Sequence, residues 1–398
     1  MINVTKAYLG NRSKFLGYVD SIYESGWLTN QGPLVRELEE RLRDYLGVRN
    51  IVLTSNGTLA LQIAYRALGL HGGSAVTTPF SFVATTSSLY WEGVRPLFAD
   101  IDRATWNLDP NAIEASITDD TRAIVATHVF GNACDVDAID RVAERHGLKV
   151  IYDGAHAFGV RHRGASLFSR GDISTLSFHA TKLFHTIEGG AIVTNDDALA
   201  DRIRLLCNFG IVDTDLIDGV GINAKLNEFA AAMGLCILDD MPLILEQRAE
   251  IADRYERRLG GHFDLQRQQP ESERNHSYFP IALASEAQLL SCRSALNRQG
   301  INPRRYFYPS LDTLDYLQPQ PAQAESRSLS RRVLCLPIYP GLPLHVQELV
   351  IDTLLAQVVR REPQPTPAHW PGFALAAGRQ REKLELLARS KTWPGVTP

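Results

Sequence analysis

Short apolar segments alternate with amphipathic segments along much of the chain. Runs of apolar and β-branched residues about as long as a strand predict β-strands, and apolar residues recurring every three or four positions predict helices. The expected strands lie near residues 51–54, 75–78, 95–99, 122–127, 149–152, 174–178 and 190–194. The expected helices between them lie near 58–68, 82–92, 111–116 and 135–146. This alternation favours an α/β fold with a mainly parallel seven-stranded sheet covered by helices.

The flanking segments are less regular. Residues 1–24 form a mixed lead-in, and Gly32-Pro33 opens a helix through Tyr45, because proline at the first turn lacks only an N–H that the helix leaves unused. Beyond Thr194 the pattern predicts a helix at 197–206, a glycine-rich stretch at 218–228 and a long helix from about 228 into the 240s. The remaining expected elements are helices at 243–259, 286–299 and 343–360 and a strand at 276–283.

These elements divide the chain into three parts. We expect a large domain over residues 1–240, a smaller C-terminal α+β domain over 241–361, and a tail over 362–398. The tail begins as a proline-rich linker, and its segment from Phe373 to Ser390 has the pattern of an amphipathic helix. No function is assigned to it.

Composition narrows the class of protein. The chain has 398 residues, of which 44% are hydrophobic and 22% charged, as expected of a globular protein. Its net charge of -4 gives no electrostatic case for binding nucleic acid or an anionic membrane. The five cysteines are widely spaced, which favours reduced thiols in the cytoplasm over disulfides or zinc ligands, and no metal site is expected. The chain has no apolar run of about 18 residues and no signal-peptide core at Met1 to Lys6.

Two strand ends carry residues that point to chemistry. The strand at 174–178 runs into a polar loop that ends in Lys182, and the strand at 149–152 delivers Asp153, with His156 three residues later. Separately, these residues have ordinary interpretations as a surface lysine and a turn residue. Together they match the needs of pyridoxal phosphate (PLP), in which a carboxylate keeps the pyridine nitrogen protonated and a lysine carries the aldehyde.

A third element strengthens this interpretation. Ser55-Asn56-Gly57-Thr58 joins a strand to a helix, so that backbone amides and the Thr58 hydroxyl lie at a helix N-terminus, which binds phosphate. Taken alone, the stretch is better explained as an ordinary capped turn between a strand and a helix. In a parallel sheet, however, all three elements fall at the carboxyl ends of strands, where ligands gather.

The order of these elements resembles that of fold type I PLP-dependent transferases, specifically the sugar-nucleotide aminotransferases of the DegT/DnrJ/StrS type. The resemblance covers nearly all of residues 1 to about 360. Its motifs are Trp27 to Pro33, Ser55 to Thr58, Pro79 to Thr85, His128 to Gly131, Asp153 to Ala157 and Ser177 to Lys182.

The resemblance implies a role for each residue around the cofactor. Lys182 would hold the cofactor aldehyde as an aldimine, and Asp153 would pair with the ring nitrogen. Phe82 would stack on the ring, and His156 would lie near the ring hydroxyl. The phosphate would be held by Gly57, Thr58 and Ser177.

The resemblance also implies a homodimer with shared active sites. The glycine-rich stretch would cross the interface, so that Asn223 and Lys225 approach the phosphate of the neighbouring site. From spacing alone, this stretch is equally a flexible loop capped by Asn227. Ala224 departs from the family pattern, in which an aromatic residue is frequent at this position.

Substrate contacts are expected in three places. The loop from Arg304 to Leu311 combines arginines with aromatics, which suits either a domain-interface core or contact with a diphosphate and a base or sugar. The expected substrate-binding residues are Thr29, Asn30, His185, Arg305, Phe307 and Tyr308.

The motifs are most similar to those of enzymes that aminate C4 of dTDP-4-keto-6-deoxyglucose, with glutamate as amino donor. A C3 aminotransferase would use the same residues. A dehydratase that uses pyridoxamine phosphate (PMP) would carry histidine in place of Lys182, and a non-catalytic binding protein would be expected to have lost Lys182 or Asp153. The sequence leaves open the nucleotide, the keto position and the configuration of the new amine.

Overall fold

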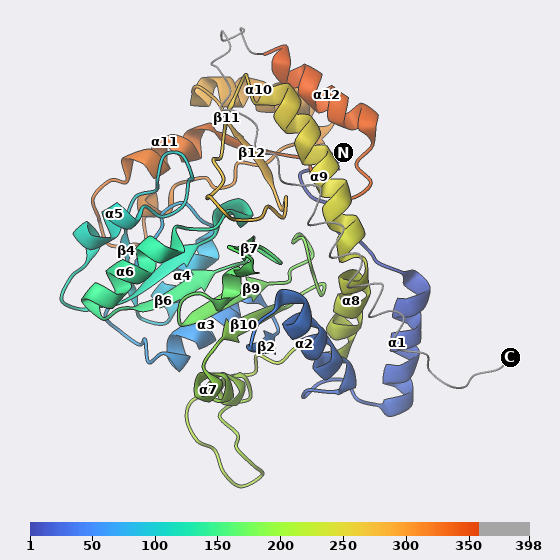
Figure 1. Cartoon of the computed structure of the whole chain (residues 1–398), viewed down its shortest axis with the longest axis vertical. Helices are drawn as coiled ribbons and strands as arrows, with labels where there is room; N and C mark the ends of the chain where they lie inside the picture. Colours follow the sequence, from blue (N-terminus) through green and yellow to red (C-terminus); the bar gives the residue numbers. More distant parts are fainter. Residues whose placement is uncertain (358–398) are drawn as a thin grey trace, which may run out of the picture. The chain divides into compact units, whose positions relative to one another are not determined.

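A seven-stranded sheet forms the centre of the computed structural model, which describes residues 1–357 (Figure 1). Its strands are β2 (Asn50–Thr54), β3 (Ser74–Thr77), β4 (Arg95–Phe98), β5 (Thr121–Thr127), β6 (Lys149–Asp153), β9 (Ile173–Ser177) and β10 (Gly190–Thr194). They are arranged in the order β2-β10-β9-β6-β5-β3-β4, and β10 runs antiparallel to both neighbours while the other pairs are parallel. The predicted α/β fold with a mainly parallel seven-stranded sheet is confirmed.

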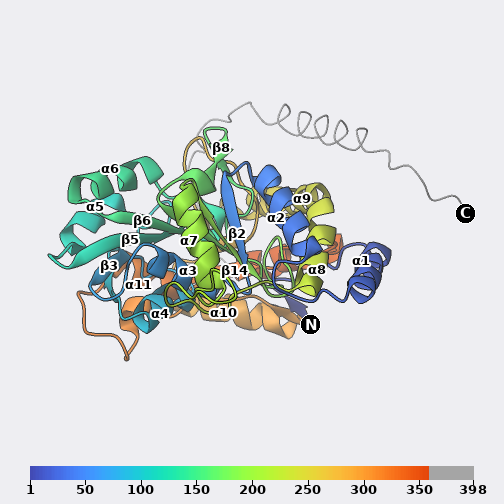
Figure 2. The same ribbon diagram turned by 90° about the horizontal axis from the view of Figure 1, so that it is seen from below.

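Helices cover both faces of this sheet (Figure 2). One face packs against α3 (Gly57–Ala67), α4 (Val83–Trp91) and α7 (Asp197–Cys207). The other packs against α2 (Pro33–Leu46), α6 (Val136–His146) and α8 (Glu228–Asp239). Successive strand residues point to opposite faces. Val52 and Ile192 therefore join the hydrophobic cluster on the face of α3, whereas Ile51 and Val193 join the cluster on the face of α2. The strands are therefore apolar on both sides, as the sequence pattern indicated.

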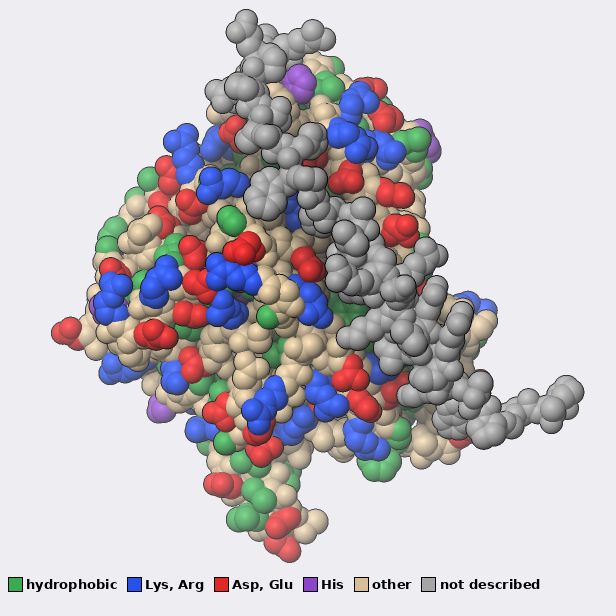
Figure 3. All heavy atoms as spheres, viewed as in Figure 1, with side chains coloured by type: hydrophobic (Ala, Val, Ile, Leu, Met, Phe, Trp, Pro, Cys, Tyr) green, Lys and Arg blue, Asp and Glu red, His purple; other side chains and the backbone are tan. Residues whose placement is uncertain are grey.

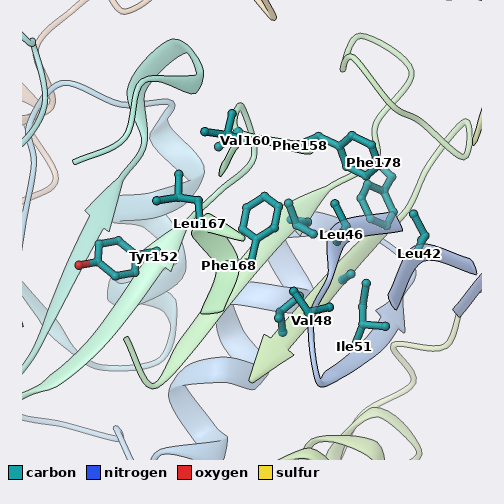
Figure 4. Packing of buried hydrophobic residues seen from close by; sticks show 14 of the residues in the cluster. Leu42, Leu46, Val48, Ile51, Tyr152, Phe158, Val160, Leu167, Phe168 and Phe178 are labelled. Atoms are coloured by element: carbon teal, nitrogen blue, oxygen red, sulfur yellow. The ribbon is translucent and has the colours of Figure 1, made fainter. Parts of the chain in front are cut away.

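The loop that carries Lys182 is anchored by aromatic packing. Figure 4 shows Phe158 and Phe178 packed in the cluster with Leu42 of α2. The Phe178 and Phe184 rings meet edge to face at 4.8 Å, and Phe158 stacks on Phe184 at 4.5 Å. Because Phe178 and Phe184 lie on either side of Lys182 in sequence, burial of both rings fixes the loop between them.

The C-terminal part has its own hydrophobic cluster. Helix α9 (Met241–Leu259) links this cluster to the sheet. Its first turns contribute Met241 and Ile244 to a cluster that packs on the sheet, and its later turns contribute Ile251, Tyr255 and Leu259 to the separate cluster of the C-terminal part. The remaining elements are α10 (Glu286–Arg298), α11 (Ala324–Arg332), α12 (Leu344–Leu355), an antiparallel sheet of β11 (Asp264–Leu265), β12 (Phe279–Ala282) and β14 (Val333–Leu336), and the parallel pair β1 (Ile2–Asn3) and β13 (Ile301–Asn302). We retain a domain boundary near residue 240 as a proposal.

Several boundaries differ from the sequence-based prediction. The long helix expected from residue 228 is interrupted, because Pro242 in the first turn of α9 cannot supply the N–H that a continuous helix needs. The lead-in contains α1 (Arg12–Ser25), whose pattern was weak because Ile22 is its one buried residue. The expected helix at 111–116 is a short α5 (Pro110–Ile113) followed by a 3-10 turn. Helix α11, strand β14 and the hairpin of β7 (Arg161–His162) and β8 (Ala165–Ser166) were not predicted, and the tail lies outside the described residues.

The surface carries both signs of charge. Figure 3 shows acidic and basic side chains interspersed over the face in view. Within residues 1–357, no helix is both long and apolar enough to cross a bilayer. All five cysteines are buried free thiols.

Candidate active site

Lys182 follows β9 in a loop that runs between the buried side chains of Phe178 and Phe184. Its own side chain is partly buried. Burial lowers the pKa of its amine below the ordinary lysine value, against the opposing influence of the Asp153 carboxylate and Tyr306. A lower pKa increases the fraction of neutral amine at a given pH, and the neutral amine is the form that attacks a carbonyl.

Asp153 ends β6 with its carboxylate almost fully buried, at 6% exposure. Oδ1 accepts the Ala155 N–H at 3.0 Å, and Oδ2 accepts the Thr85 hydroxyl at 2.7 Å. Thr85 lies 2.9 Å from the Ser81 hydroxyl, which lies 3.1 Å from that of Thr127. Since an ionised carboxylate only accepts, the Thr85 proton points at Asp153, and Ser81 in turn donates to Thr85. A carboxylate has about four acceptor sites, so capacity remains for a cationic N–H.

His156 is held in one tautomer. Its Nδ1 accepts the Phe130 N–H at 3.2 Å, so the proton of the neutral ring lies on Nε2. Burial, with the nearby Lys182 charge, holds its pKa well below the ordinary histidine value. In the described part of the chain Nε2–H has no acceptor, so the ring offers an unused donor. The ring planes of His156 and Phe307 are nearly parallel at 5.5 Å.

The N-terminus of α3 forms a cup with the ends of β9 and β10. The Asn56 side chain accepts the Leu59 N–H at 2.8 Å, whereas the Gly57 and Thr58 amides have no acceptor within the helix. A Cβ on Gly57 would lie 2.7 Å from that of Ser177, and one on Gly190 would lie 2.7 Å from the Asn56 carbonyl. Only glycine permits this approach, which brings amides and hydroxyls together where a phosphate dianion would be bound.

Phe82 lies at the start of α4, next to the hydroxyl chain that reaches Asp153. Its ring is 55% exposed and contacts no other aromatic ring in the described residues. An exposed apolar ring that follows a residue of this hydroxyl chain is available to stack on a planar ligand.

The segment with Asn223 and Lys225 is attached to the same cup. The Ala224 carbonyl accepts the Ser55 N–H at 2.7 Å, which joins the two loops through their backbones. The side chain of Asn223 is exposed. Lys225 instead donates to Asn208 at 2.9 Å and lies 4.7 Å from the centre of the Phe209 ring, so its amine is engaged within its own chain.

The loop with Thr29 and Asn30 is exposed but held at its base. The Glu228 N–H donates to the Leu28 carbonyl at 3.0 Å. The buried Glu228 carboxylate accepts the first amides of α2, from Leu34 at 2.8 Å and Val35 at 3.0 Å. A carboxylate at a helix N-terminus is favourable, and here it also fixes the loop to α8. Asn30 and Lys225 line one groove of about 730 Å³.

The other expected substrate residues are mostly engaged inside the chain. His185 donates through Nε2 to the Tyr8 carbonyl at 2.8 Å and accepts the Ile187 N–H at 3.3 Å. Arg305 pairs with Glu286 at 2.7 Å and lies 3.6 Å from the centre of the Tyr308 ring. Phe307 is buried against His156, whereas Tyr308 is 50% exposed. Of these four, Tyr308 offers the most surface to a ligand, and all four roles stay predictions.

Sequence reasoning missed several residues at the site. Thr85, Ser81 and Thr127 form the hydroxyl chain that supports Asp153. The Tyr278 ring packs against the His156 ring, and Tyr306 lies near enough to Lys182 to influence the pKa of its amine. Thr85 and Ser81 belong to the Pro79 to Thr85 motif, but single hydroxyl residues have no periodicity that would indicate their contact with Asp153. The two tyrosines come from the C-terminal part and reach the site only through the tertiary fold.

Comparisons with known proteins agree with this geometry. Residues 11–355 match the model of the DegT/DnrJ/EryC1/StrS aminotransferase family. The chain is 41% identical over 360 residues to dTDP-4-amino-4,6-dideoxy-D-glucose transaminase from Shigella dysenteriae, covering 89% of this chain and 98% of the relative.

Two solved structures extend the comparison. The structure of DesI, determined in the presence of its TDP-sugar product, superposes with a TM-score of 0.84 at 35% identity, covering 98% of this chain and 95% of DesI. The structure of NtdA from Bacillus subtilis with bound PMP gives a TM-score of 0.80 at 28% identity, covering 88% of this chain and 83% of NtdA.

The opposite environments of two lysines predict a measurable difference. Burial lowers the pKa of Lys182, whereas at Lys14 the hydrogen bond and charge of Asp239 outweigh burial and raise it. In cofactor-free protein with ¹³C-methylated lysines, NMR titration should show Lys182 titrating below 10.5 and Lys14 above it. The Lys182→Arg variant identifies the Lys182 signal by its loss. A Lys182 amine that titrated above the ordinary value would contradict the proposed activation by burial.

Proposed function

The chain belongs to the DegT/DnrJ/EryC1/StrS aminotransferase family, and on this premise we propose that it transfers an amino group from glutamate to C4 of dTDP-4-keto-6-deoxyglucose. The enzyme is a PLP-dependent sugar-nucleotide aminotransferase. The observation that carries the mechanism is the convergence of a partly buried amine, a buried carboxylate and a phosphate cup at adjoining strand ends. The choice of sugar is supported by the similarity to the Shigella transaminase and to DesI.

The residues present fit PLP. Gly57, Thr58 and Ser177 would hold the phosphate, and Asp153 would accept a hydrogen bond from the ring nitrogen. His156 has a free Nε2–H to donate to the ring hydroxyl, and the exposed Phe82 ring would cover one face of the cofactor. When bound, PLP carries the amino group and withdraws electrons from the carbon that is deprotonated.

Lys182 has two tasks in this mechanism. Its amine would hold the cofactor aldehyde between turnovers, and burial, which lowers the pKa of that amine, favours its nucleophilic neutral form. Once released by the amino donor, the same amine acts as general base and acid. The Lys182 amine would take the proton from Cα of glutamate in the first half of the reaction, and it would move a proton in the opposite direction on the sugar in the second half. The hydroxyl chain that ends at Thr85 keeps the Asp153 oxygens oriented throughout.

Assembly as a homodimer belongs to the same proposal. Residues 208–222, here called the tongue, extend beyond α7 (Figure 1) and carry hydrophobic side chains in the space-filling view (Figure 3). The exposed apolar residues of the tongue are Phe209, Ile211, Val212, Leu216, Ile217, Val220 and Ile222. Val220 is 86% exposed. Such a cluster on a surface indicates a covered interface, and a second copy would bring Asn223 to the neighbouring cup. The buried free thiols suit a cytoplasmic location.

Removal of the Lys182 amine should abolish turnover while leaving the cup intact. Loss of a general acid–base group costs about 10² to 10⁴ in rate, and loss of aldehyde binding should bring Lys182→Ala below detection. The variant should still fold and bind PMP, whereas Lys149→Ala, at an exposed lysine paired with Asp172, should behave as wild type. Borohydride reduction of the wild type followed by mass spectrometry should recover the pyridoxyl group on Lys182. Recovery on another lysine would refute the assignment.

The sugar proposal is tested by the product. With glutamate and a panel of keto sugar nucleotides, turnover should be fastest on dTDP-4-keto-6-deoxyglucose, and NMR of the product should place nitrogen at C4. The 3-keto isomer and UDP-linked keto sugars serve as competing substrates. Nitrogen at C3 would establish the C3 aminotransferase instead.

The shared site predicts that cofactor retention depends on assembly. Asn223→Ala should weaken PLP binding without changing the unfolding temperature, since the side chain is exposed in its own chain. Asn297→Ala is the matched control, because Asn297 is exposed and its side chain has no partner among the described residues. Equilibrium dialysis and sedimentation measure the two properties. A fully active monomer would be incompatible with the shared site.

A further inference from the structure

Residues 275–278, here called the strap, pack against the turn that carries His156. The His156 carbonyl accepts two hydrogen bonds from the strap, one from the Asn275 amide at 2.8 Å and one from the Ser277 hydroxyl at 2.8 Å. The Asn275 amide also donates to the Phe158 carbonyl at 3.1 Å. Both donating side chains are buried, so solvent does not compete for these bonds. A segment more than a hundred residues away therefore fixes the backbone of this turn.

The strap also meets the residues that fix the His156 ring. The Asn275 Oδ1 accepts the Ser277 N–H at 3.1 Å, and a Cβ on Gly131 would lie 2.4 Å from this oxygen. Gly131 follows Phe130, whose N–H holds Nδ1 of His156. Position 131 therefore requires glycine, which also adopts its φ of 87° without strain. This lets the strap pack against the His156 carbonyl and, at the same time, against the segment whose Phe130 N–H binds the histidine Nδ1.

Tyr278, the last residue of the strap, supports the ring itself. Its ring meets the His156 ring edge to face at 5.0 Å and the Phe130 ring at 5.6 Å. With near-parallel Phe307 at 5.5 Å, the imidazole is enclosed by aromatic groups. Its unused Nε2–H is the polar group that this packing leaves for a ligand.

Arg248 of α9 anchors the strap through its backbone carbonyls. This arginine is 3% exposed and donates through Nη1 to the His276 carbonyl at 3.1 Å and the Ser277 carbonyl at 3.2 Å. It has no carboxylate partner among the described residues, and burial lowers its pKa to about 10. Burying an unpaired cation is costly, and an apolar side chain of similar length would avoid that cost. The function of the charge is then the pair of hydrogen bonds, which hold His276 at a φ of 51°.

We propose that Arg248, Asn275 and Ser277 are positioning residues that hold His156 with its Nε2–H directed at the cofactor ring. The proposal rests on the proposed function for the identity of the group that receives this hydrogen bond. The position of the imidazole itself is set by the apoprotein.

Arg248→Met removes the donors and keeps the length of the side chain. In cofactor-free protein, the ring-nitrogen NMR signals of His156 should then move from one tautomer toward a mixture of two. PLP should bind about tenfold more weakly, as expected for the loss of one hydrogen-bonded support. Arg248→Lys should restore most of both properties, because its amine can still donate to the carbonyls. Arg254→Met is the matched control, since Arg254 lies on the same helix and bonds to Gln347, away from the strap.

A double-mutant cycle separates positioning from general loss of stability. In a His156→Phe background, Arg248→Met should change the PLP dissociation constant much less than in the wild type. Ser277→Ala, a smaller change, provides the same cycle if Arg248→Met fails to fold. Fully additive effects, or an unchanged His156 tautomer in both variants, would overturn the role of the strap. A wild type that binds no PLP would instead refute the proposed function, and the NMR result would still decide the role of the strap.

Discussion

The pairing of β9 between β6 and β10 is the constraint on which the site depends. In this register Asp153 lies opposite Thr175, and Ser177 lies opposite Gly190. The carboxyl end of β9 therefore lies next to the Asp153 carboxylate. The same strand continues through Ser177 into the cup and the Lys182 loop. Because side chains alternate along a strand, a slip of one residue would turn every one of these side chains to the opposite face of the sheet. Burial on both faces prevents such a slip, since each register position is matched to one of two hydrophobic clusters.

Burial then gives the site its protonation states. At Lys182 it favours the neutral amine, and at His156 it favours the neutral imidazole. The hydrogen bonds that remain inside the protein assign the directions: Phe130 places the histidine proton on Nε2, and Thr85 points its proton at Asp153. The apoprotein thus holds the Lys182 amine, a histidine N–H donor and a carboxylate acceptor, the groups on which the proposed mechanism depends. Such preorganisation removes the cost of arranging these groups when the cofactor and substrate arrive.

The support of the site extends beyond the sheet. Glu228 holds the loop of Asn30 against α8, and the strap holds the turn of His156 against the C-terminal part. Both supports are buried polar contacts between segments that are distant in sequence. A buried polar contact has few acceptable geometries, because an unmet donor or acceptor is costly, and it therefore fixes position more sharply than apolar packing does.

The sequence by itself determined the strands of the seven-stranded sheet, most of the helices, and the residues at the ends of β2, β6 and β9. These features are local: an apolar run, a capped helix start or a motif such as Ser55 to Thr58 is encoded within a few neighbouring residues. The tertiary structure decided which distant groups meet. It engaged His185 and Arg305 inside the chain, connected Thr127 through two hydroxyls to Asp153, and brought the strap to His156. Such contacts join isolated polar side chains across the fold, and a single polar residue has no periodicity from which its partner can be inferred.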